Sequence, residues 1–118
     1  MKKIIFYSYL KCSTCIKAAK WLKSKDFEFQ LIDIVKEPPL LNYLDLALEQ
    51  YSDDKKRIFN TRGKAFKKLD LDIDRFSKEE IIQLLLSDGK LIKRPFLIYE
   101  EKKVILGFNE IQYANQFL

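Results

Sequence analysis

The two cysteines of this chain, Cys12 and Cys15, are separated by two residues and lie where the hydrophobic pattern changes period. Residues 3–9 (KIIFYSY) are β-branched or aromatic, which is typical of a buried strand. From Ser13 onward the apolar residues recur at helical spacing, with lysines on the other side. We therefore predict a strand-to-helix turn that carries both cysteines, with Ser13 as the helix N-cap. The predicted apolar stripe of this helix comprises Ile16, Ala19, Trp21 and Leu22.

Residues 27–34 (FEFQLIDI) predict a second strand, which runs parallel to the first because a helix-length connection joins the two. Residues 96–108 (FLIYEEKKVILGF) predict a hairpin, and the last ten residues predict a helix capped by Asn109. Between these parts the pattern is mostly helical. The predicted helical segments are 40–51, a short helix within 52–59, one or two turns within 61–69, and 77–89 with a serine cap, whereas 70–76 is predicted to be a loop.

The expected order is β-α-β, a helical insert, and then β-β-α. A C-x-x-C motif at the first helix N-terminus of such an order is typical of the thioredoxin fold. We predict one α/β domain over residues 1–118, with a thioredoxin/glutaredoxin-like mixed sheet built from about 1–37 and 91–118 and an insert of about 38–90.

Composition excludes several classes of protein. The apolar share of 47% indicates a globular chain, and the uncharged apolar runs are too short to span a membrane. The N-terminus lacks the pattern of a signal peptide, so we expect a cytoplasmic protein. The net charge of +5 is moderate and no nucleic-acid-binding motif is present, so we expect no direct nucleic-acid partner. We also expect no membrane contact and a monomer.

The cysteine pair admits three interpretations: a redox pair, half of a metal site, or two small buried residues. A closed zinc site needs about four ligands, and this chain has neither a histidine nor a third cysteine. In a reducing cytosol, C-x-x-C is more often catalytic or regulatory than a structural disulfide. A helix N-terminus favours the thiolate, the reactive form, so Cys12 beside Lys11 is expected to attack and Cys15 to resolve the mixed disulfide. We expect no metal and no cofactor.

The segment KRPF supplies a second signal, because Arg94 and Pro95 directly precede the predicted third strand. In a thioredoxin-like sheet the X-Pro bond at this place is often cis and lies opposite the C-x-x-C motif. The planar guanidinium of Arg94 can hold an oxyanion or a thiolate.

Together these segments resemble the arsenate reductase (ArsC-like)/Spx family of thioredoxin-like proteins over nearly the whole chain. The matching stretches are YSYLKCSTCIKAAKWL, EPP, IFNTRGKAFKKL, LLLSDGKLIKRPFLI and VILGFNE. The resemblance implies that Cys12 is the redox nucleophile and that Arg94 helps to form an anion site. The remaining candidates for anion or substrate binding are Lys11, Ser13, Thr14, Arg62 and Pro95.

Two departures separate this chain from arsenate reductases, which use three arginines. The segment that carries the middle arginine reads FNTRG, with Arg62 near Asn60, and the last position falls near Gly107. We therefore do not expect arsenate reduction. The prediction is a thiol–disulfide oxidoreductase that works with a low-molecular-weight thiol or a thioredoxin-type reductant. The alternative is an Spx-type redox-switched regulator that binds the C-terminal domain of the RNA polymerase α subunit, with Asp54 near the contact position.

Overall fold

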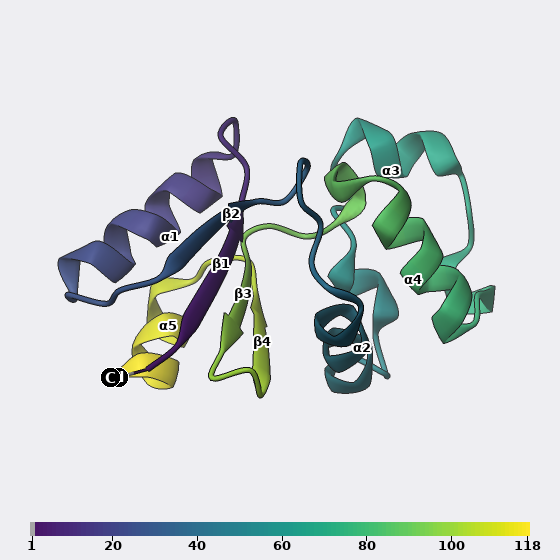
Figure 1. Ribbon diagram of the computed structural model, residues 1–118. Helices are drawn as coiled ribbons and strands as arrows, with labels where there is room; N and C mark the ends of the chain where they lie inside the picture. The colour runs from purple at the N-terminus through teal and green to yellow at the C-terminus, as the bar shows by residue number, and fades with distance from the viewer. Residues whose placement is uncertain (1) are drawn as a thin grey trace.

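Strand β1 (Ile4–Ser8) lies inside a four-stranded mixed sheet of order β2-β1-β3-β4 (Figure 1). The computed structural model describes residues 2–118. Strand β2 (Gln30–Asp33) is parallel to β1, whereas β3 (Phe96–Tyr99) is antiparallel to β1 and pairs with β4 (Lys103–Leu106). The predicted β-α-β, helical insert and β-β-α order is confirmed.

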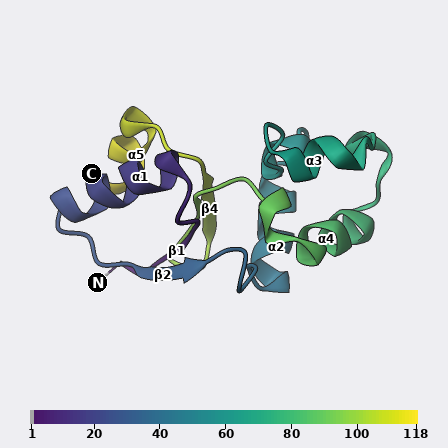
Figure 2. The same cartoon turned by 90° about the horizontal axis from the view of Figure 1, so that it is seen from above.

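The first face of the sheet packs against two helices, because alternate residues of a strand point to opposite faces. Ile4 and Phe6 of β1 lie in one hydrophobic cluster with α1 (Ser13–Ser24) and α5 (Glu110–Phe117). Trp21 contributes to this cluster, which confirms its prediction as a core residue. In Figure 2, α1 and α5 lie together on one side of the sheet.

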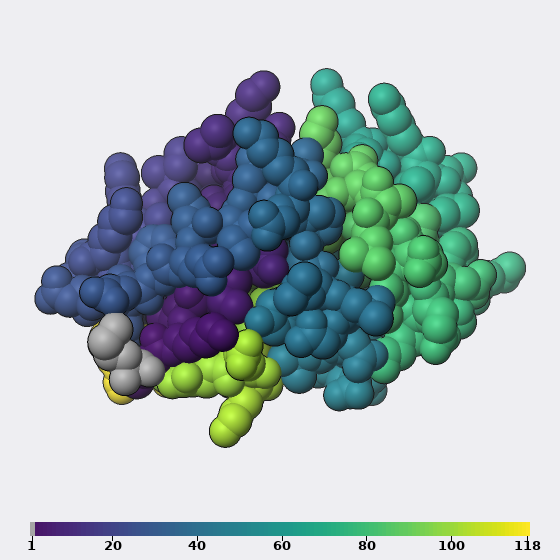
Figure 3. Space-filling view, viewed as in Figure 1, coloured from purple at the N-terminus to yellow at the C-terminus, as the bar shows by residue number. Residues whose placement is uncertain are grey.

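The helical insert covers the opposite face, where Ile5 and Tyr7 of β1 belong to a second, larger cluster. The insert therefore completes the hydrophobic core of the sheet and occupies the teal and green part of the surface in Figure 3. Its elements are α2 (Leu41–Gln50), η1 (Lys55–Ile58), α3 (Lys64–Leu69), η2 (Ile73–Arg75), α4 (Lys78–Ser87) and η3 (Gly89–Leu91), where η denotes a short 3-10 helix.

Two close contacts fix the insert on the sheet. The Gln50 side chain of α2 donates a hydrogen bond to the Val104 carbonyl and accepts one from the Val104 N–H, both at 2.7 Å, so it satisfies the edge of β4. At the end of the insert, Gly89 lies directly against the backbone of Ile34. A Cβ atom at this glycine would come within 2.1 Å of the Ile34 carbonyl oxygen, so no larger residue fits.

Three sequence predictions about β2 and α1 need correction. Strand β2 begins at Gln30 rather than at residue 27, because Gln30 is the first residue that pairs with β1, opposite Ile5. Cys12, not Ser13, is the N-cap of α1. The buried stripe of α1 also differs from the prediction, since Ile16 is 48% exposed; it comprises Cys15, Ala18, Trp21 and Leu22.

The segment of residues 70–76, predicted as a loop, contains the short helix η2. The other helical predictions are confirmed within a few residues, including the Ser77–Glu80 capping box of α4 and the Asn109 cap of α5. Among residues 2–118, no helix is both long enough and apolar enough to cross a membrane.

Candidate functional site

Cys12 closes the turn between β1 and α1. Its backbone N–H donates to the Tyr9 carbonyl at 3.0 Å, and its sulfur accepts the backbone N–H of Cys15 at 3.3 Å. A sulfur at this position satisfies one of the unpaired amides of the helix N-terminus and sits at its positive end. Because Cys12 is only half-buried, a substrate sulfur can reach it.

Cys15 lies behind Cys12, one turn into α1, and is 1% exposed. Burial, and after it a hydrogen bond with Cys12, raise the pKa of the Cys15 thiol from its ordinary value of 9.0 to about 12. The Tyr9 backbone and the Ser8 hydroxyl oppose this effect through hydrogen bonds that favour the Cys15 thiolate. The pair therefore consists of one accessible sulfur and one protonated, enclosed sulfur, both of them free thiols in this structure.

Arg94 and Pro95 lie at the same end of the sheet as the cysteine turn. The Arg94–Pro95 peptide bond is cis, as predicted. Phe96 pairs with Tyr7 in the antiparallel register, so the preceding residue, Pro95, lies next to the carboxyl end of β1. The Arg94 guanidinium stacks over the Tyr9 ring, 4.8 Å from its centroid, and donates a long 3.5 Å hydrogen bond to the Lys90 carbonyl. Tyr9 thus connects Arg94 to the turn of Cys12.

The predicted binding residues on either side of Cys12 differ in how far they are exposed to solvent. Lys11 and Ser13 are exposed and Thr14 is half-buried, all at the start of α1. Two apolar side chains also reach solvent there, Leu10 with 86% exposure and Ile16 with 48%. The surroundings of Cys12 therefore combine a cation, a hydroxyl group and exposed apolar surface.

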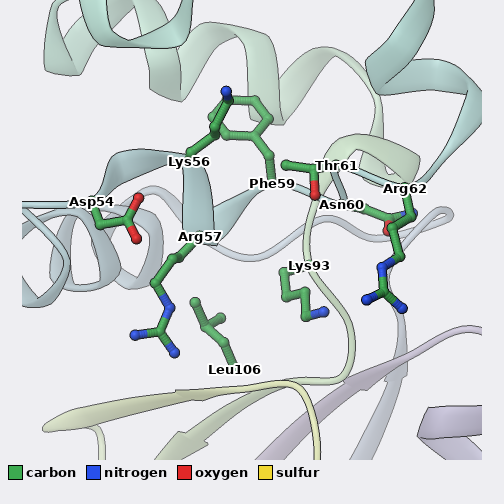
Figure 4. Close-up of a pocket in the computed structure, with 9 residues that line it drawn as sticks. All are labelled: Asp54, Lys56, Arg57, Phe59, Asn60, Thr61, Arg62, Lys93 and Leu106. Atoms are coloured by element: carbon green, nitrogen blue, oxygen red, sulfur yellow. The ribbon is translucent and has the colours of Figure 1, made fainter.

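Arg62 lies elsewhere, in a cleft of about 450 Å³ between the insert and the sheet (Figure 4). We call this the insert–core cleft; it is lined by Asp54, Lys56, Arg57, Phe59, Asn60, Thr61, Arg62, Lys93 and Leu106. No residue of the cysteine turn lines it. The structure therefore separates Arg62 from the other predicted site residues.

The sequence does not single out Arg57 and Lys93, because nothing in the linear order places η1 beside the segment that precedes β3. Backbone hydrogen bonds bring them together: Lys93 N–H donates to Ile58 O, and Asn60 N–H donates to Leu91 O, both at 2.8 Å. The Lys93 side chain also passes over Gly107, whose φ of +72° favours glycine. A Cβ atom on Gly107 would lie 3.3 Å from Cε of Lys93.

Within residues 2–118, no three Cys, Asp or Glu side chains are grouped so that they could hold a metal ion. The chain also contains no histidine.

Comparison with known proteins gives concordant matches. A model of the ArsC family matches residues 7–116. The chain is 41% identical over 116 residues to the uncharacterized protein YusI of Bacillus subtilis (strain 168), covering 97% of this chain and 98% of YusI. It is 32% identical over 107 residues to the global transcriptional regulator Spx of Lactiplantibacillus plantarum, covering 91% of this chain and 80% of that regulator.

A solved structure supports the same assignment of fold. The crystal structure of a possible arsenate reductase from Streptococcus mutans UA159 superimposes with a TM-score of 0.87 at 36% sequence identity, covering 97% of this chain and 98% of that one. The predicted fold class, an ArsC-type thioredoxin-like mixed sheet, is therefore confirmed.

Proposed function

This chain belongs to the ArsC family, and from that premise we propose that it is a thiol–disulfide redox protein whose nucleophile is Cys12 and whose resolving thiol is Cys15. The observation that carries the proposal is the geometry of the pair. The Cys12 sulfur is accessible at the N-cap of α1, and the buried Cys15 lies behind it, with its N–H 3.3 Å from that sulfur.

The proposed reaction proceeds in two exchanges. The Cys12 thiolate attacks one sulfur of a substrate disulfide, forms a mixed disulfide and releases the other substrate sulfur as a thiolate. Cys15 then loses its proton and attacks the Cys12 sulfur, forming the Cys12–Cys15 disulfide and releasing the second substrate thiolate. Two electrons pass to the substrate, and an external low-molecular-weight thiol or a thioredoxin-type dithiol returns them.

The environment of Cys15 supports this order of events. While Cys12 is free, its hydrogen bond and its charge both raise the pKa of Cys15. A mixed disulfide at Cys12 removes that charge, whereas the Ser8 hydroxyl and the Tyr9 backbone continue to favour the Cys15 thiolate. Reaction at Cys12 thus shifts Cys15 toward the thiolate, while burial, the largest cause of the raised pKa, remains.

Arg94 and its neighbours are proposed to bind the substrate. The guanidinium on the Tyr9 ring can stabilise a thiolate or carboxylate that approaches Cys12, with Lys11 and the Ser13 and Thr14 hydroxyls at the rim and Pro95 bounding the groove. We expect no arsenate reduction, because Asn60 and Gly107 supply no guanidinium group to neutralise a small, multiply charged oxyanion. Arg94 is the one predicted guanidinium group that lies beside the cysteine turn.

An aromatic disulfide that releases a coloured thiolate tests the proposal. The reduced chain should release two thiolates per molecule and end with a Cys12–Cys15 disulfide. Cys15→Ser should release one thiolate and retain a mixed disulfide visible by mass spectrometry, and Cys12→Ser should release none at a comparable rate. If Cys12→Ser reacts like the parent chain, the proposed role of Cys12 is wrong.

The second candidate is a redox-switched regulator of the Spx type, favoured by the similarity to that regulator over 91% of this chain. Its partner would be the C-terminal domain of the RNA polymerase α subunit, contacting the exposed surface around Asp54. A pull-down with that domain under reducing and oxidising conditions tests it. Binding in one redox state but not the other supports a regulator, and no binding in either state rejects it. Either activity belongs in the cytoplasm, where such thiols and the polymerase occur.

A further inference from the structure

The insert–core cleft has the composition of an anion site. Its lining contains four cationic side chains and a single carboxylate, that of Asp54. In the part of the chain that the structure describes, Arg57, Arg62 and Lys93 form no ion pair with any carboxylate. Unpaired like charges that converge in a concave site repel one another, and an anion relieves this repulsion while the protein walls focus the potential.

The three cations are arranged around a shared space. In Figure 4, Arg57 and Arg62 lie on opposite sides of Lys93, and the Lys56 ammonium points away from it. Arg57 is held against the Tyr51 ring, 5.1 Å from the centroid, which orients its guanidinium without neutralising it. Lys93 is held across Gly107.

The size and lining of the cleft restrict the ligand. A volume of about 450 Å³ falls within the range of small-molecule sites, so it exceeds what a single inorganic oxyanion fills. Phe59 and Leu106 add apolar surface that suits a carbon skeleton. Because Arg57 and Arg62 lie on either side of Lys93, a ligand whose anionic groups are also spaced apart can contact more than one of these cations.

We propose that the insert–core cleft binds a small organic polyanion, a molecule with two or more carboxylate or phosphate groups, through Arg57, Arg62 and Lys93. The site differs from the cysteine turn in both its residues and its chemistry, so the proposal goes beyond the redox function and stands without it. The ligand spans the insert and the segment that leads to Arg94 and Pro95, and binding therefore ties the insert to the side of the sheet that carries the cysteines.

Calorimetric titration of the full reduced chain at low ionic strength tests this proposal. The probes are citrate for the carboxylate class and fructose 1,6-bisphosphate for the phosphate class, with inorganic phosphate as the single-group probe. At least one organic probe should bind more tightly than inorganic phosphate, and the better organic probe identifies the anionic group. Arg57→Gln/Lys93→Gln should weaken its binding by about tenfold or more, since charge-assisted hydrogen bonds are lost.

A matched variant separates a defined site from general attraction to a basic protein. Lys67→Gln/Lys68→Gln removes the same charge from exposed positions of α3 that do not line the cleft. The affinity of this variant for the organic probe should therefore stay near that of the parent chain. Asp54→Asn should tighten binding, because it removes the one carboxylate of the lining. Equal weakening in both double variants, no binding of either organic probe, or equally tight binding of inorganic phosphate would each overturn the proposal.

Discussion

The cysteine turn and the insert–core cleft are built by opposite means. The turn needs only consecutive residues: Tyr9 accepts the Cys12 N–H, and Cys12 accepts the Cys15 N–H. The cleft needs residues of η1, the segment before β3 and the end of β4, which meet only after the insert has packed on the sheet. The cysteine turn is thus a local structure, whereas the cationic cleft depends on the whole fold.

The largest expected effect is that the cysteine turn and the cleft can each be inactivated without affecting the other. Cys12→Ser should abolish disulfide exchange, because a hydroxyl cannot replace the thiolate as a nucleophile, and should leave polyanion binding unchanged. Arg57→Gln/Lys93→Gln should show the reverse pattern. Exchange kinetics and titration calorimetry on both variants measure this, and loss of both properties in either variant would show that the sites are one unit.

The next effect is a difference in reactivity within the turn itself. At about pH 8, iodoacetamide should modify Cys12 and spare Cys15, because the Cys15 thiol is enclosed and its pKa is raised to about 12. Peptide mass mapping of the labelled chain reports the sites. Both cysteines should react after unfolding in guanidinium, which is the control. Rapid labelling of Cys15 in the folded chain would contradict its burial.

The same raised pKa has a consequence for stability. The unfolded thiol ionises near its ordinary value of 9.0, and the folded thiol only near about 12. The folded state therefore retains a proton that the unfolded state loses, so this contribution is complete below about pH 9 and is lost as the pH rises toward about 12. Denaturant unfolding should show a steeper alkaline loss of stability for the parent chain than for Cys15→Ala.

The smallest expected effect concerns the joint between the insert and the sheet. Gly89→Ala should lower the free energy of unfolding by about 1–3 kcal/mol, because its Cβ meets the rigid Ile34 carbonyl at 2.1 Å. Gly63→Ala is the matched control, since its nearest neighbour is the flexible Asn60 side chain at 2.6 Å. Urea unfolding measures both variants, and an equal cost at the two positions would mean that Gly89 does not fix the insert.

Periodicity predicted much of the fold because the signals are short-range. The strand of residues 3–9, the capping box at Ser77 and the hairpin after Pro95 each carry their pattern within a few residues. The failures are also informative. Strand β2 starts only at Gln30, and the preceding Phe27 and Phe29 pack against the cluster of α1 and α5 without pairing with β1. Ile16 is exposed because Ala18, Trp21 and Leu22 form the side of α1 that packs on the sheet. Neither fact is contained in the segment itself.

The sequence by itself determined that the two cysteines lie together at the start of a helix. Cys12, Cys15 and the helix that begins between them are close in the chain, so their geometry follows from local hydrogen bonding. Only the tertiary structure decided where the cations lie. Arg94 was predicted to serve the cysteine turn and stacks on Tyr9 beside it, whereas its neighbour Lys93 lies between Arg57 and Arg62 in the cleft. The physical reason is that a charge acts through space, and the packing of the insert on the sheet sets those distances.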